Sequence, residues 1–233
     1  MSEFADWAVR WIELASYAEA EFPVEEGRIE QVIDLWHEPV PPGWERAAGE
    51  DARLLTRKRF TRKIAKGEPK KELAIEATVL ADGVPPTEFM GEPIIDGVNA
   101  VPLVKGDRGL GEVEADLVLL IGEGARRRLA VVEVKVDANH AWYAAVENLR
   151  QVKLVLASPV RALFAQRRPE LSLSVDLPVA AVVLAPPDFY AHRGQKANAA
   201  GPARELFDRV RQELGIEARL ATFDAAVGPI FGR

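Results

Sequence analysis

Three charged residues stand inside stretches of sequence that are otherwise aliphatic. Asp116 precedes the run LVLLI, and Glu133 and Lys135 interrupt the run AVVEVKV. Carboxylates and ammonium groups are costly to bury unless they pair with one another or bind a metal ion. Two carboxylates suffice to hold Mg²⁺, and a lysine beside them can orient a water molecule or stabilise charge on a phosphate. The three residue types therefore indicate metal-assisted hydrolysis of a phosphodiester.

A β-hairpin over residues 111–136 would bring these three residues together. Its two strands are rich in Val, Leu and Ile, and Gly122 and Gly124 lie between them. Side chains alternate along a strand, so Glu133 and Lys135 share one face, which Asp116 approaches from the paired strand. The carbonyl of Val134 is then placed to add a metal ligand. In the competing interpretation Glu133 and Lys135 form an ion pair on an exposed face, but the valines around them favour a sheet that is covered on both faces.

The remaining pattern predicts an α/β protein with a mixed sheet flanked by helices. We expect a helix after Lys135, capped by Asp137 or Asn139 and closed by Pro159, and then a buried strand over 176–187. A helix over 201–214, ended by Gly215, and a strand over 216–223 follow. Before the hairpin we expect a strand over 99–104, a loop over 84–98, and a segment over 70–82 whose pattern fits a helix or a strand.

Around the hairpin, the sequence resembles the PD-(D/E)xK nuclease superfamily, whose fold is restriction-endonuclease-like. The resemblance covers about residues 99–223 and implies Mg²⁺ or Mn²⁺ as cofactor. It also implies Asp116 and Glu133 as metal ligands and Lys135 as the catalytic lysine. Ala115 stands where the family motif has proline, and Gln151 is followed by Val155 where some members have tyrosine. For the further acid that the family often carries on the preceding helix, the candidates are Glu72 and Glu76, with Glu114 on the hairpin itself.

The expected partner is nucleic acid, with DNA favoured over RNA. Because the chain of 233 residues has a net charge of −6, nucleic acid would have to bind at a local basic patch. Two groups of residues are candidates for such contacts. The first is a basic block that contains Arg57, Lys58, Arg59, Arg62 and Lys63. The second is a polar loop that contains His192, Arg193 and Lys196. Endonuclease and exonuclease action are both open. The alternative function is a catalytically inactive nuclease-like module for nucleic-acid binding or assembly.

The proline-rich stretch that ends at Gly43 divides the chain into an N-terminal helical extension, 1–43, and a nuclease-like domain, 44–233. We expect amphipathic helices over 2–22 and 24–37, the first carrying Trp7 and Trp11. These tryptophans either dock on the main core or anchor a homodimer or another protein partner. There is no cysteine and no membrane-spanning apolar run, so a cytoplasmic protein is expected.

Overall fold

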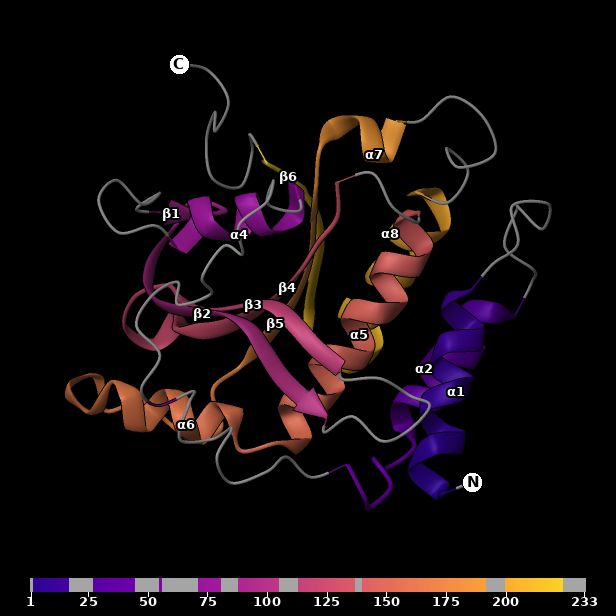
Figure 1. Cartoon of the computed structure of the whole chain (residues 1–233), viewed down its shortest axis with the longest axis horizontal. Coiled ribbons are helices and arrows are strands. Elements are labelled where there is room, and N and C mark those ends of the chain that lie inside the picture. Colours follow the sequence, from indigo (N-terminus) through magenta and orange to yellow (C-terminus); the bar gives the residue numbers. More distant parts are fainter. Residues whose placement is uncertain are drawn as a thin grey trace, which may run out of the picture.

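The computed structural model describes most of the chain. The described residues are 2–16, 27–44, 55, 71–80, 88–104, 113–136, 140–191 and 200–223. They form an α/β structure in which one sheet carries helices on both faces (Figure 1).

The sheet has six strands that follow one another in chain order. They are β1 (Glu88–Phe89), β2 (Glu92–Val104), β3 (Val113–Ile121), β4 (Arg128–Val134), β5 (Val179–Ala185) and β6 (Glu217–Thr222). Neighbours from β1 to β4 are antiparallel, whereas β4, β5 and β6 are parallel. The expected mixed sheet and its central hairpin, β3 with β4, are therefore confirmed. Pairing changes sense at β4, the strand that carries Glu133.

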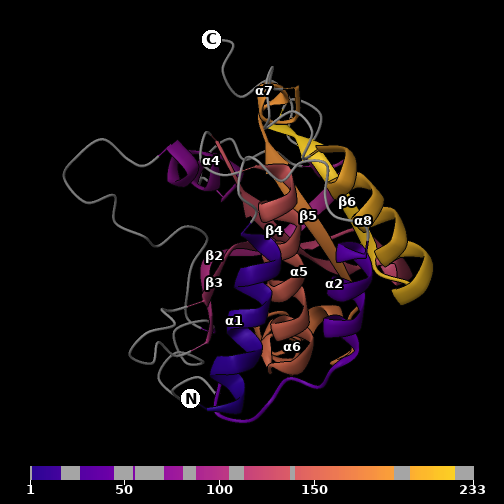
Figure 2. The same ribbon diagram turned by 90° about the vertical axis from the view of Figure 1, so that its right-hand side faces the viewer.

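Helix α5 (Ala141–Ala157) provides the crossover from β4 to the parallel strand β5, as parallel pairing requires. Its N-cap is His140, whose Nδ1 accepts a hydrogen bond from the backbone N–H of Tyr143 at 3.1 Å. The cap expected at Asp137 or Asn139 is thus wrong, although the length of the helix and its end before Pro159 are confirmed. Figure 2 shows α1 and α8 (Ala200–Leu214) beside α5 on the same side of the sheet.

Strand β2 is longer than the sequence pattern indicated. The stretch 84–98 was expected to be a loop because it contains prolines and glycines, yet 92–98 belong to β2. Beside β2, on the side away from β3, the short β1 pairs only with Glu92 and Pro93, so most of that edge has no described strand partner. A proline on such an edge loses no ladder hydrogen bond, and Pro102 is therefore tolerated within β2.

Helix α4 (Lys71–Leu80) occupies the segment for which helix and strand were both open. Its buried residues Ile75 and Val79 pack on the face of the sheet opposite α5. Gly97 of β2 allows this close approach, since a Cβ there would lie 2.7 Å from side-chain carbons of both Leu80 and Leu119. The glycine in β2 thus marks helix packing and not a loop.

The N-terminal helices α1 (Glu3–Ala15) and α2 (Arg28–His37) pack on α5, and their buried residues join the apolar cluster that α5 forms with the sheet. Trp7 and Trp11 are each only 1% exposed. The indole N–H of Trp142, on α5, donates to the carbonyl of Leu14 at 2.8 Å. The tryptophans therefore dock on the main core, which is the first of the two interpretations, and they are not available as anchors for a partner.

Two short helices complete the path of the chain. Helix α6 (Val160–Arg167) follows α5 directly and was not predicted, while α7 (Pro187–Ala191) begins the polar loop after β5. Gly215 ends α8 with φ +65°, as expected for a glycine at C′. Among the described residues no helix is long and apolar enough to span a membrane.

Candidate active site

At the carboxyl end of β4, the pairing with β5 continues on one side, while the pairing with β3 ends on the other. The ladder with β3 ends at the pair Leu117 and Val132, whereas the ladder with β5 continues through Val134. The next residues along β3 and β4 are Asp116 and Glu133, which therefore face each other where the two strands part. The backbone N–H of Val134 donates to Oδ2 of Asp116 at 2.7 Å, in place of a ladder partner. The sheet thus positions both carboxylates at one point, as predicted.

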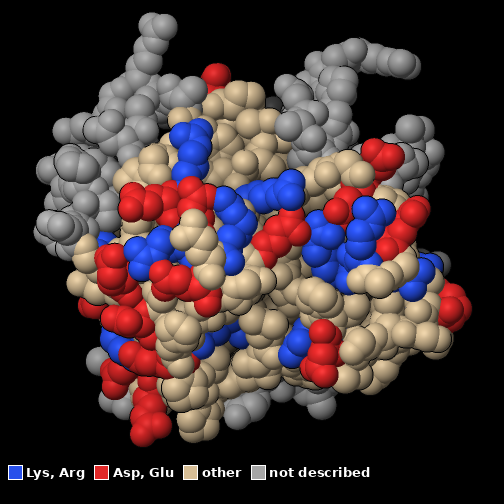
Figure 3. Space-filling view, turned by 180° about the vertical axis from the view of Figure 1, so that it is seen from behind, with Lys and Arg blue, Asp and Glu red and all other residues tan. Residues whose placement is uncertain are grey.

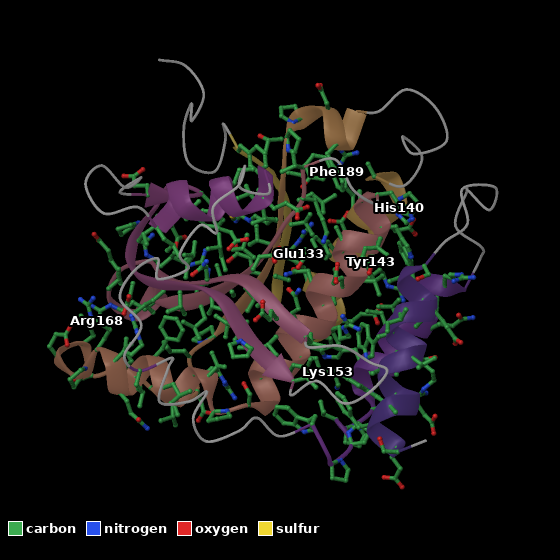
Figure 4. All side chains as sticks on the ribbon, in the orientation of Figure 1. Glu133, His140, Tyr143, Lys153, Arg168 and Phe189 are labelled. Atoms are coloured by element: carbon green, nitrogen blue, oxygen red, sulfur yellow. The ribbon has the colours of Figure 1, made fainter. Side chains whose placement is uncertain are left out.

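Lys135 directly follows β4, and its backbone N–H still bonds to the carbonyl of Leu184 at 2.9 Å. Its ammonium group forms an ion pair with Oε1 of Glu133 and lies 3.1 Å from Oε2 of Glu147 on α5. It also lies 5.9 Å from the ring centroid of Tyr143. In Figure 4, Glu133 lies between the sheet and α5, with Tyr143 beside it. The interpretation as an ion pair on an exposed face is therefore wrong, because Glu133 is 2% exposed and is covered by α5.

Burial perturbs the proton affinities of both carboxyl groups. It raises the pKa of Asp116 from 3.8 to about 6, against the hydrogen bond from Val134 and the attraction of Lys135. Burial also raises the pKa of Glu133 well above its usual value, with repulsion from Asp116 and Glu147 adding to the effect. For Lys135, burial acts to lower the pKa, but attraction to Glu133 and Glu147 prevails and raises it. Buried acids whose pKa values are raised in this way are often found at functional sites.

Gln151 of α5 contacts Glu133 from the helix side. Its Nε2 donates both to Oε2 of Glu133 and to the carbonyl of Glu114, the latter at 3.1 Å. Since both partners are acceptors, the amide must turn its NH₂ group toward them, and its Oε1 is then buried without a hydrogen bond. Val155, one turn further along α5, is fully buried in the apolar core. The half-motif noted in the sequence thus places its glutamine at the site.

The three candidates for a further acid at the site, Glu72, Glu76 and Glu114, have different surroundings in the structure. Glu72 on α4 is close enough to Asp116 to contribute to the raised pKa of that residue. Glu76 is buried and its Oε2 accepts a hydrogen bond of 3.0 Å from the side chain of Asn99, which gives it a structural partner. Glu114 contributes its backbone carbonyl, to Gln151. Of the two glutamates on α4, Glu72 is therefore the one that acts on the site.

Glu147 is a site residue that the sequence analysis missed. It touches Lys135 and raises the pKa of both Asp116 and Glu133. A usable signal was present, because residues four apart lie on one face of a helix, and Glu147 stands midway between Tyr143 and Gln151. The pattern of polar residues on the buried side of α5 could therefore have revealed it.

The predicted nucleic-acid-binding residues all lie outside the described residues. This holds for the basic block, Arg57, Lys58, Arg59, Arg62 and Lys63, and for the loop residues His192, Arg193 and Lys196. On the face seen in Figure 3, Lys and Arg are interspersed with Asp and Glu. On α8, Arg209 and Arg211 form ion pairs with Glu213 and Asp208. This mixture of charges does not provide a continuous basic track.

The residues at the end of β4 present carboxylate oxygens that could hold a metal ion. Among the described residues, no three His, Asp or Glu side chains converge closely enough to form a metal-binding group. The donor set still suits Mg²⁺ or Mn²⁺, because one or two carboxylates with water complete such a site, and Asp116 and Glu133 supply two. The buried Oε1 of Gln151 is a further oxygen without a donor. An ion would also offset the repulsion that raises the pKa of both acids.

No family model, no curated protein and no solved structure matches this chain.

Proposed function

We propose that this protein is a metal-dependent nuclease that hydrolyses phosphodiester bonds, with DNA as the expected substrate. One observation carries the proposal: a buried pair of acids, Asp116 and Glu133, lies with Lys135 where two sheet strands part. Keeping three charges inside an aliphatic sheet costs stability, and a catalytic role explains why they are present.

The order of elements supports the finer assignment to a restriction-endonuclease-like fold. Helix α4 precedes the antiparallel strands β2, β3 and β4, and α5 then leads to the parallel strand β5. The resemblance in the sequence involves the strands with the motif, the following helix and a later strand, and the superfamily often carries a glutamate on the helix before the sheet. Together they make this fold the one that we propose for the chain.

In this mechanism Asp116 and Glu133 would hold Mg²⁺ or Mn²⁺, together with the carbonyl of Val134. The metal, when bound, supplies a water of lowered pKa and neutralises charge on the phosphate. Lys135 is held at the end of β4 and stays protonated at neutral pH, because its pKa is raised. Its ammonium group would orient the attacking water or stabilise the negative charge that develops on the phosphate oxygens.

Gln151 and Glu147 position these groups from α5. Gln151 donates a hydrogen bond to Oε2 of Glu133 and thereby restricts the orientation of that carboxylate. Glu147 holds the Lys135 ammonium when Glu133 is engaged elsewhere, since Lys135 contacts both carboxylates. The ammonium would therefore keep an anionic partner throughout the reaction.

The test is hydrolysis of supercoiled, linear and single-stranded DNA and of RNA, with Mg²⁺, Mn²⁺ or EDTA. Asp116→Asn, Glu133→Gln and Lys135→Met should each lose at least about a hundredfold in rate, since each removes a group that acts on the reacting atoms. Asp176→Asn is the matched control, because the Asp176 side chain is 80% exposed and far from the end of β4. Wild-type protein that cleaves none of these substrates, yet binds nucleic acid without metal, would instead support an inactive binding module.

A further inference from the structure

Arg150 of α5 is a largely buried arginine whose guanidinium makes no hydrogen bond with the described part of the chain. Its side chain is 12% exposed, and its Nε is buried with no hydrogen-bond partner. The nearest acidic oxygen is Oε1 of Glu147, 3.9 Å from Nη2, which is beyond hydrogen-bonding distance. The Nε–H of Arg150 is thus buried without an acceptor, which is unfavourable, and the terminal N–H groups of its guanidinium have no hydrogen-bond acceptor among the described residues. The environment of Arg150 therefore requires an explanation.

Other arginines of the protein with little exposure show how such a side chain is normally accommodated. Arg167 is 9% exposed, and its guanidinium makes two hydrogen bonds with the buried carboxylate of Asp96. Arg128 is 14% exposed and bonds Glu92 through two nitrogens. Both are bidentate pairs of the kind that guanidinium favours. Arg150 has no such pair, so a purely structural role does not account for its burial.

Arg150 lies next to the candidate active site. Glu147 contacts Arg150 with one carboxylate oxygen and Lys135 with the other, so the two cations flank the same acid. Arg150 also acts on the phenol of Tyr143, whose ring lies beside Lys135. An anion bound near Lys135 would therefore be within reach of the unsatisfied donors of Arg150.

We propose that Arg150 binds a phosphate group of the nucleic-acid substrate, through the fork of N–H groups that is left without hydrogen bonds. This inference rests on the proposed function and names a substrate contact for it. The planar guanidinium matches the geometry of phosphate oxygens bidentately, which the ammonium of a lysine does not. Glu147 keeps the side chain in place at a distance, without occupying its donors. Arg150 thus adds a phosphate contact beside the hydrolytic groups.

The test compares Arg150→Gln and Arg150→Lys with the matched control Arg209→Gln. Arg209 lies on α8 in exposed ion pairs with Glu213 and Glu30, so its substitution changes net charge equally, away from the site. Binding of a fluorescein-labelled DNA duplex is measured in EDTA and in Ca²⁺ at several salt concentrations. Arg150→Gln should weaken binding about tenfold and lower the slope of log K against log[salt] by about one. Arg150→Lys keeps the charge, so it should retain the slope and still bind several-fold more weakly.

Hydrolysis separates this inference from the proposed function. If the wild type cleaves DNA, Arg150→Gln should lower kcat/KM at least about tenfold while Arg209→Gln leaves it unchanged. Equal binding, equal salt slope and equal kcat/KM for Arg150→Gln and Arg209→Gln would overturn the role of Arg150, although the nuclease would stand. If the wild type cleaves nothing, the nuclease proposal fails, and the salt slope alone decides whether Arg150 contacts phosphate. A wild type that binds no nucleic acid overturns both.

Discussion

The buried acid pair should make the metal-free protein less stable at neutral pH than at mildly acidic pH, and Asp116→Asn should remove part of that loss. Because the pKa of Asp116 is raised from 3.8 to about 6, the folded protein retains a proton that the unfolded chain releases. The folded state binds more protons in that window, so its stability falls as the pH rises from about 4 to about 6. Asparagine is neutral at every pH and avoids this loss.

The expected magnitude follows from the same shift. Raising the pKa from 3.8 to about 6 corresponds to about 3 kcal/mol, at 1.36 kcal/mol per pH unit. Since the Asp116 side chain is not completely buried, we expect Asp116→Asn to exceed the wild type by about 2 kcal/mol above pH 6 and to match it near pH 4. The side-chain oxygen of asparagine can still accept the hydrogen bond from Val134, so the geometry should be retained.

Urea unfolding followed by tryptophan fluorescence in EDTA, at a series of pH values, measures the difference. Asp176→Asn is the control for general charge effects, since that side chain is 80% exposed. Adding Mg²⁺ or Mn²⁺ at neutral pH should stabilise the wild type more than Asp116→Asn, because only the wild type keeps both ligands. A stability difference that does not change with pH, or a wild type that is the more stable protein at neutral pH in EDTA, would refute the reasoning.

Three further substitutions test the packing around the site. Lys135→Met should cost about 3 kcal/mol or more at neutral pH in urea unfolding, because it leaves the buried carboxylate of Glu133 and the partly buried one of Glu147 without their cation; a loss below about 1 kcal/mol would contradict the ion-pair geometry. Gln151→Leu should cost about 1–3 kcal/mol by the same measurement, since Glu133 and a backbone carbonyl lose their donor, and should slow hydrolysis. Gly97→Ala should cost about 1–3 kcal/mol, because its Cβ would lie 2.7 Å from two leucine side chains. Gly201→Ala, in helix α8, meets no atom within 4 Å and should not lower the melting temperature.

The core of the site was predictable because it depends on local rules. Alternation along a strand and the antiparallel geometry of a hairpin together bring Asp116, Glu133 and Lys135 to one point. The crossover to β5 also follows from sequence, since a helix lies between two strand-like runs. These features require no knowledge of how distant parts of the chain pack.

Features that depend on tertiary packing were not predictable in the same way. The prolines and glycines of residues 84–98 indicated a loop, but residues 92–98 belong to β2, and Gly97 serves the packing of α4. The contact of Glu147 with Lys135 depends on the angle at which α5 crosses the sheet. Because that angle is set by apolar packing along the whole helix, the polar pattern of α5 could mark Glu147 as a candidate but could not show that it contacts Lys135.

The change of pairing sense at β4 explains why the charged residues lie where they do. Within the antiparallel ladder, alternate backbone N–H groups of β4 bond to β3 and the others point to β5, and the side chains beside them are aliphatic. Where β3 leaves, the N–H of Val134 would lose its partner, and the carboxylate of Asp116 satisfies it. At the same residues β5 still fixes the backbone, so Glu133 and Lys135 are held in place while α5 packs against them. A strand end held in this way suits the preorganised site that we propose, and α5 adds Glu147, Arg150 and Gln151 beside it.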